Sequence, residues 1–132
     1  MSRYCLDTSA YSHLMRGDPE VARLVDQAEW IGMPAITAGE LRTGFLFGRR
    51  RLENESELVE FLNHPVVQLV PVDLEVSRLF AEIVVDLRRA GRPLPTNDIW
   101  IAASSARAGA LVLTFDRHFE EIARVGSVVL EA

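Results

Sequence analysis

Four acidic residues in this chain have the type and the placement needed for metal chemistry: Asp7, Glu40, Asp98 and Asp116. Carboxylate oxygens are the hard ligands that Mg²⁺ and Mn²⁺ prefer. One cysteine and no obvious histidine pair argue against a zinc site. A divalent cation held by carboxylates can lower the pKa of a water molecule and stabilise charge on a leaving oxygen. The set therefore indicates metal-assisted chemistry at a phosphate group, with activated water in place of a side-chain nucleophile.

Such a group of acids also needs a cation for electrostatic reasons. Two unit charges about 4 Å apart repel by roughly 4 kcal/mol at an effective dielectric constant near 20. Several such pairs would strain a domain whose total stability is on the order of 5–15 kcal/mol. If the four acids meet, we therefore expect Mg²⁺ between them, with Mn²⁺ as a possible substitute.

Each acid also has a purely structural interpretation. Thr37 and Glu40 form the T-x-x-E pattern of a capping box, in which Glu40 only satisfies a helix end. Asp98 could complement a helix dipole, and Asp116 could be a turn residue. Asp7 is harder to explain in this way, because it directly ends an apolar stretch of strand character.

Apolar runs of strand type alternate with segments of helical period, which is typical of an α/β fold with a mostly parallel sheet. Strands are expected over residues 3–6, 30–33, 66–70, 111–114 and 128–130. Helices are expected over residues 9–15, 19–28, 37–47, 51–63, 73–90 and 97–108, with a short helix over 117–124.

This alternation predicts where the acids lie. Open parallel sheets bind ligands beyond the carboxyl ends of their strands. Asp7 and Asp116 fall at such ends, and Glu40 and Asp98 fall in the first turns of helices that start near the same edge. We therefore expect all four carboxylates at one end of the sheet.

Length and composition fit a single domain over residues 1–132. No apolar run approaches the roughly 20 residues of a membrane span, and the N-terminus lacks the apolar stretch of a signal peptide. A cytoplasmic protein without a membrane partner is expected. The single cysteine, Cys5, is expected in a buried strand.

The formal net charge of −5 argues against a simple basic nucleic-acid binder. Without the four candidate ligands, however, 15 acids face 14 bases, so net charge says little about the partner. Every basic residue is arginine, so phosphate contacts must use guanidinium or backbone N–H groups. Arg42, Arg49 and Arg50 are candidates for binding RNA.

Four segments together resemble the signatures of the PIN domain, in the order and spacing of the VapC toxins of VapBC toxin–antitoxin systems. They are L-D-T-S-A-Y at 6–11, T-A-G-E-L at 37–41, N-D-I-W-I-A-A at 97–103 and T-F-D-R-H-F at 114–119. The resemblance implies a Mg²⁺-dependent endoribonuclease with a central five-stranded sheet between two helical layers. It also implies a homodimer and a VapB-like antitoxin.

By the same resemblance, the acids above form the catalytic, metal-binding quartet, with Asp7 and Asp98 as the most direct ligands. Hydroxyl and amide groups would support the site, and the resemblance assigns this role to Thr8, Ser9, Asn97 and Thr114. The three histidines, His13, His64 and His118, are interpreted as incidental, although His118 could border the site.

Two other functions are compatible with part of this pattern. Receiver domains and aspartyl phosphatases also place Asp at strand ends, but both usually need a lysine at the phosphate, and this chain has none. A catalytically silent PIN scaffold is the remaining alternative. Metal binding through Asp7 and Asp98 distinguishes the two, because a silent scaffold need not bind Mg²⁺ or Mn²⁺.

Overall fold

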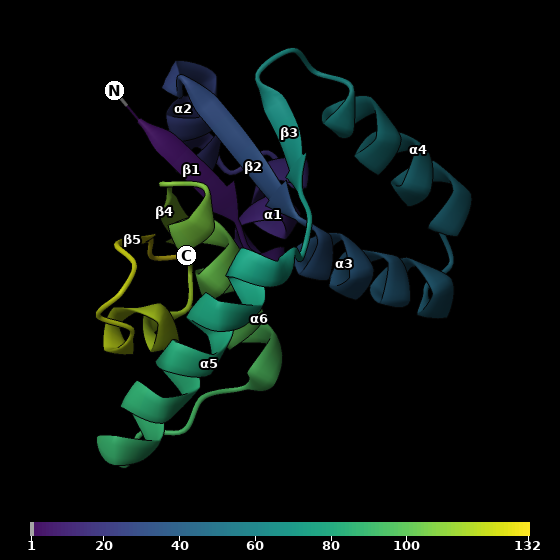
Figure 1. The fold of residues 1–132 in the computed structure, drawn as a ribbon. Coiled ribbons are helices and arrows are strands. Elements are labelled where there is room, and N and C mark those ends of the chain that lie inside the picture. The colour runs from purple at the N-terminus through teal and green to yellow at the C-terminus, as the bar shows by residue number, and fades with distance from the viewer. Residues whose placement is uncertain (1) are drawn as a thin grey trace.

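The computed structural model describes residues 2–132 and contains one five-stranded sheet (Figure 1). The strands lie in the order β3-β2-β1-β4-β5, and all four neighbouring pairs are parallel. Their bounds are Arg3–Leu6 for β1, Trp30–Pro34 for β2, Val67–Val70 for β3, Leu111–Thr114 for β4 and Ser127–Val129 for β5. The predicted α/β fold with a parallel sheet is confirmed.

Six α-helices and one 3-10 helix connect these strands within the described residues. The helices are α1 Thr8–Met15, α2 Pro19–Gln27, α3 Ala35–Phe47, α4 Arg51–Leu62, α5 Leu74–Arg89 and α6 Thr96–Arg107. The 3-10 helix η1 covers Arg117–Glu121, where the sequence predicts a slightly longer helix. The other predicted boundaries differ from the observed ones by at most two residues at nearly every end.

Neighbouring residues of a strand point to opposite faces of the sheet, and each face packs against apolar side chains of the helices. Leu113 belongs to an apolar cluster that includes Tyr11 of α1 and Leu58 of α4. Its neighbour Val112 belongs to a second cluster, which includes Ile101 of α6. Figure 1 shows α5 and α6 packed together in front of the sheet. The three layers predicted from the sequence are therefore present, and Cys5 is fully buried, as expected.

The helices differ in how their N-termini are capped. Asp18 and Asp73 cap α2 and α5 with their side chains, and aspartate is a preferred residue at this position. In contrast, α3 and α6 follow Pro34 and Pro95, and neither has a side-chain cap. Glu40 in the second turn of α3 and Asp98 in the first turn of α6 are therefore not used as N-caps.

The order of the strands creates a crevice. From β1 the chain moves outward on one side of the sheet to β2 and β3, and later places β4 and β5 on the other side. The carboxyl ends of β1 and β4 are thus the topological switch point, where open parallel sheets bind ligands.

Among the described helices, none combines the length and apolar character that crossing a bilayer requires.

Candidate functional site

A cleft at this switch point contains all four acids singled out from the sequence. Asp7 follows β1, Asp116 follows β4, Glu40 lies on α3 and Asp98 on α6. The cleft has a volume of about 400 Å³ and is also lined by Ser12, His13, Arg16 and Ile101. Two of the predicted supporting residues, Thr8 and Ser9, line it as well. Parallel strands and their following helices thus bring residues more than 100 positions apart to one edge.

Asp7 is the most buried and most firmly held of the four, with a side chain that is 5% exposed. Its Oδ1 accepts hydrogen bonds from the Ser9 hydroxyl at 2.8 Å and from the backbone N–H of Ala10 at 2.9 Å. The hydroxyl of Thr114 donates to its Oδ2. Asp7 therefore caps α1 and is fixed to β4 at the same time.

The predicted supporting residues Ser9 and Thr114 also join the ends of β1 and β4. The Ser9 hydroxyl accepts from the backbone N–H of Phe115 at 3.0 Å, and Thr114 Oγ1 accepts from the N–H of Asp116 at 2.9 Å. Thr114 is fully buried. These bonds fix the backbone that carries Asp116 relative to Asp7.

Glu40 is held by the other two predicted supporting residues. Thr8 donates its hydroxyl proton to Oε1 at 2.6 Å, and the Asn97 amide donates to Oε2 at 3.2 Å. The capping-box interpretation is wrong, because α3 begins at Ala35 and Glu40 lies in its second turn. Thr37, the other half of that pattern, instead donates to the carbonyl of Leu6 at 3.0 Å.

Asp98 and Asp116 both lie near the imidazole of His118, which is beside the cleft. His118 Nδ1 lies 3.6 Å from Asp98 Oδ2 and 3.2 Å from Asp116 Oδ1. One ligand atom from each of these residues lies within 4.8 Å of the other two. Asp116 also accepts from the backbone N–H of His118 at 2.9 Å, so it caps η1 as well as facing the cleft. His118, interpreted from the sequence as incidental, therefore lies against two of the four acids.

Burial and neighbouring negative charges raise the pKa values of acids in this cluster. The pKa of Asp98 rises from 3.8 to about 6, first because of burial and then because of Asp116, Glu40 and Asp7. Burial also raises the pKa of Asp7, against the hydrogen bonds from Thr114, Ala10 and Ser9. Clustered carboxylates with raised pKa values either take up protons or bind a cation. The donor set of Asp98, Asp116 and His118 is close enough together to hold one ion.

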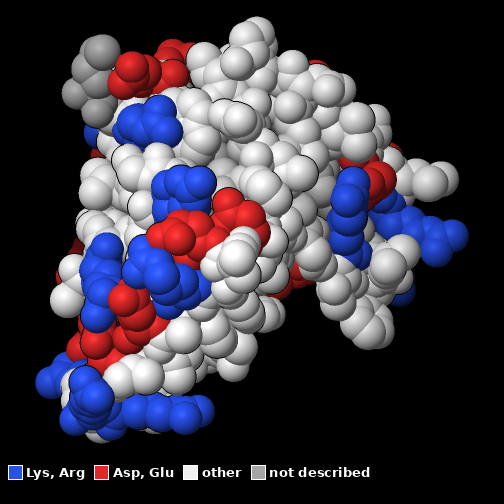
Figure 2. All heavy atoms as spheres, in the orientation of Figure 1, with Lys and Arg blue, Asp and Glu red and all other residues white. Residues whose placement is uncertain are grey.

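The arginines predicted to bind RNA lie elsewhere. Arg42 pairs with Glu55 at 2.6 Å and Arg50 with Glu53 at 2.7 Å, while Arg49 is exposed at the end of α3. Figure 2 shows basic side chains at the α3–α4 end of the molecule, and arginines mixed with acids over α5. The arginine that does line the acidic cleft is Arg16, which the sequence analysis missed. The role of Arg42, Arg49 and Arg50 stays a prediction.

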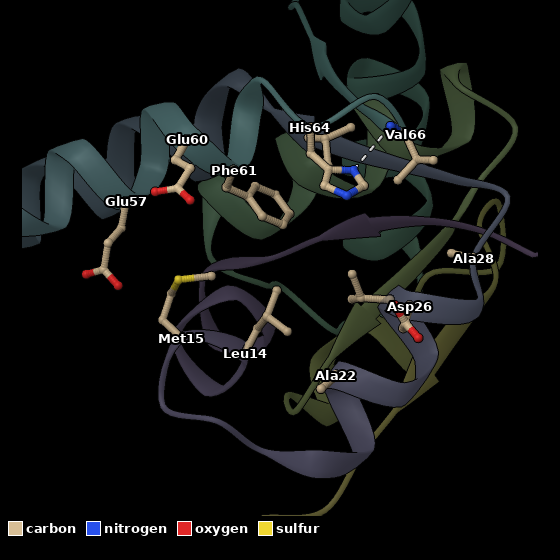
Figure 3. Close-up of a pocket in the computed structure, with 12 residues that line it drawn as sticks. Leu14, Met15, Ala22, Asp26, Ala28, Glu57, Glu60, Phe61, His64 and Val66 are labelled. Carbon is tan, nitrogen blue, oxygen red and sulfur yellow. Dashed lines mark hydrogen bonds between the residues drawn. The ribbon is translucent and has the colours of Figure 1, made fainter.

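A second hollow, of about 480 Å³, lies between α1, α2 and the end of α4 (Figure 3). Its wall is largely apolar and includes Leu14 and Phe61. Figure 3 shows Asp26 on the opposite side of this hollow from Glu57 and Glu60. Because its acids are separated in this way, the hollow lacks the convergent carboxylates of the cleft.

Comparison with known proteins agrees with this geometry. The PIN domain family model matches residues 4–125. The VapC ribonuclease Y4jK of Sinorhizobium fredii is 31% identical over 84% of this chain and 85% of that protein. Ribonuclease VapC1 of Haemophilus influenzae is 30% identical over 90% and 91%, respectively.

Solved structures show the same fold. VapBC-1 from nontypeable Haemophilus influenzae superposes with a TM-score of 0.85 and 23% identity, covering 96% of this chain and 97% of the other. DNA-bound VapBC from Salmonella typhimurium superposes with a TM-score of 0.84 and 23% identity, covering 98% of each chain.

Proposed function

The chain belongs to the PIN domain family and is a relative of the VapC ribonucleases, and from this premise we propose that it is a metal-dependent endoribonuclease. The reaction is hydrolysis of an RNA phosphodiester bond. The observation that carries the proposal is the meeting of four carboxylates at the switch point, where the pKa of Asp98 rises to about 6. A site with this much like charge is suited to a divalent cation.

The proposed ligands of the cation are the four carboxylates, with Asp7 and Asp98 as the most direct. When bound, Mg²⁺ or Mn²⁺ supplies Lewis acidity, which eases deprotonation of water and neutralises charge on the phosphate. The protein's own part is to fix the ligands. Ser9 and Thr114 orient Asp7, while Thr8 and Asn97 orient Glu40. Ligands held in this way need little rearrangement during reaction.

We further propose that the chain is the toxin of a toxin–antitoxin pair. The solved relatives named above are VapBC toxin–antitoxin structures, and this chain covers nearly all of the compared length. A VapB-like antitoxin is therefore the proposed protein partner and RNA the proposed substrate. The homodimer expected from the resemblance belongs to the same proposal.

Cleavage of a mixture of structured RNAs by partner-free protein tests the enzyme. Discrete products are expected with Mg²⁺ or Mn²⁺, and none with chelator or with the Asp7→Asn variant. Asp26→Asn is the matched control, because Asp26 is an exposed acid on α2 outside the acidic cleft. Folded, metal-binding protein that cuts no RNA would leave two explanations, a native substrate missing from the mixture or a silent scaffold. Equal cleavage by Asp7→Asn would mean a contaminating nuclease or a different site.

A further inference from the structure

A smaller polar pocket adjoins the acidic cleft and is called the flanking pocket below. It has a volume of about 260 Å³ and lies between α1, α3 and α4. Ser12 and Arg16 line both hollows, so the two lie side by side. Ordinary small-molecule sites have volumes of roughly 300–1,000 Å³. The flanking pocket is therefore sized for one unit of a longer substrate that also occupies the cleft.

Arg16 is the cation at the junction of the two hollows. It is the C-cap of α1, whose N-cap is Asp7. Side chains on a helix lean toward its N-terminus, so Arg16 leans back toward the cleft. With eight residues, α1 separates the two ends by about 12 Å. The guanidinium thus lies beside the acids rather than among them.

The charge of Arg16 is also available. Within residues 2–132, Arg16 forms no ion pair, and it is exposed. Arg50, the other arginine of the flanking pocket, pairs with Glu53 at 2.7 Å. A guanidinium that no protein carboxylate satisfies, next to a phosphodiester-cleaving site, is suited to bidentate contact with a phosphate.

The wall of the flanking pocket offers further polar groups. Tyr11 lines it and is 2% exposed, and its hydroxyl has no hydrogen-bond partner in the described chain. Burial and the charges of Glu57 and Glu55 raise the pKa of Tyr11 to about 12, so the hydroxyl keeps its proton. Asn54 adds an amide. Because Glu57 also lines the pocket and repels anions, a phosphate would lie on the Arg16 side.

We propose that the flanking pocket holds the RNA nucleotide next to the scissile phosphate, and that Arg16 contacts the phosphate of this neighbouring nucleotide. The proposal rests on the proposed cleavage of RNA in the acidic cleft. Arg16 is then a substrate-binding residue that sets the register of the strand. The polar groups of Tyr11 and Asn54 face the sugar or base of the same nucleotide.

Binding of a short, fluorescein-labelled single-stranded RNA, followed by fluorescence anisotropy at several salt concentrations, tests this proposal. The parent protein carries Asp98→Asn, so that RNA is bound but not cut. Adding Arg16→Gln is expected to weaken binding by about 5- to 20-fold. The slope of log affinity against log salt should become shallower by about 0.7, the value for one phosphate contact on a single strand.

Arg88→Gln is the matched control, because Arg88 is an exposed arginine in the last turn of α5 and lines neither hollow. It should change neither affinity nor salt slope. Equal affinity for the parent and the Arg16→Gln protein overturns the proposal, and so does weaker binding with an unchanged salt slope. If the parent itself binds no RNA, the proposed function fails first, which is a distinguishable result.

Tyr11→Phe gives a second test. Because the hydroxyl has no partner in the described chain, its removal should leave the Tm of the free protein unchanged or raise it. RNA binding should weaken by about 2- to 10-fold, the loss of one hydrogen bond. A lower Tm with unchanged RNA affinity would mean that the hydroxyl serves the fold and not the substrate, against the proposal.

Discussion

Replacing Asp98 by asparagine should stabilise the metal-free protein, although it removes a proposed ligand. Burial and three neighbouring acids raise the pKa of Asp98 from 3.8 to about 6. At pH 7 the carboxylate is therefore ionised at a cost in folding free energy. One pKa unit is worth about 1.4 kcal/mol, so a shift of this size bounds the cost at roughly 3 kcal/mol. Asparagine keeps the shape and removes the charge.

The expected gain is smaller than this bound. The Asp98 side chain keeps 19% of its surface exposed, so solvent screens part of the repulsion. We expect Asp98→Asn to raise the free energy of unfolding by about 1–2 kcal/mol in EDTA at pH 7. For a domain of this size the Tm should rise by about 3–10 °C.

Adding Mg²⁺ should reverse the order of the two proteins. Wild-type protein gains about 2.7 kcal/mol when free Mg²⁺ is at 100 times its dissociation constant, whereas the variant, lacking a ligand, gains less. Urea unfolding of both proteins, with and without Mg²⁺, measures this crossing. Asp26→Asn, at an exposed site on α2, should stay within about 0.5 kcal/mol of wild type in both conditions.

Two results would contradict these expectations for Asp98→Asn. Loss of stability in Asp98→Asn without metal would mean that the ionised carboxylate makes net favourable contacts in the fold. Equal stabilisation of both proteins by Mg²⁺ would mean that the ion binds away from Asp98.

Three further predictions concern the protonation of the acids, the hydrogen bond of Thr114 and the packing of Gly32. In metal-free protein, the free energy of unfolding should fall as pH rises from about 4 to 7, because Asp98 and Asp7 hold protons more tightly in the folded state than in the unfolded one. Urea unfolding at pH 5 and 7 in EDTA measures this change. A rise in stability over this range would contradict the prediction. Thr114→Val should lower the cleavage rate at least tenfold and the free energy of unfolding by about 1–3 kcal/mol, because Asp7 loses a buried hydrogen-bond donor. Initial cleavage rates measure the first effect, and urea unfolding measures the second. Gly32→Ala should destabilise the fold by about 1–3 kcal/mol, because its Cβ would lie 2.6 Å from the Trp30 ring; an unchanged Tm would show that the ring moves freely.

Local patterns predicted the elements that position the site. Short apolar runs followed by a single acid, as at Asp7 and Asp116, mark strand ends, because a buried strand cannot continue through a charge. Parallel strands then place such ends at one edge of the sheet. Helical periodicity fixed α5 closely, since its apolar face is long and its N-cap, Asp73, is a standard one.

Features set by distant contacts could not be predicted in this way. The Thr37–Glu40 pattern indicates a capping box, but Pro34 ends β2 and α3 begins directly after it, which moves Glu40 into the second turn. Arg16, at the far end of α1 from Asp7, lines the cleft through its long side chain, and the spacing of residues in the sequence does not show this. The ion pair of Arg42 could not be predicted either, because its partner Glu55 lies on the next helix.

A cation held by the four carboxylates should contact the phosphate that is cut, and cleavage of a sulfur-substituted RNA measures this contact. One non-bridging oxygen of each phosphate is replaced by sulfur, which Mg²⁺, a hard cation, binds poorly. Cleavage in Mg²⁺ should fall strongly, and the softer Mn²⁺ should restore it in wild-type protein but not in Asp98→Asn. Equal cleavage of oxygen- and sulfur-containing RNA in Mg²⁺ alone would contradict direct contact between the cation and the phosphate.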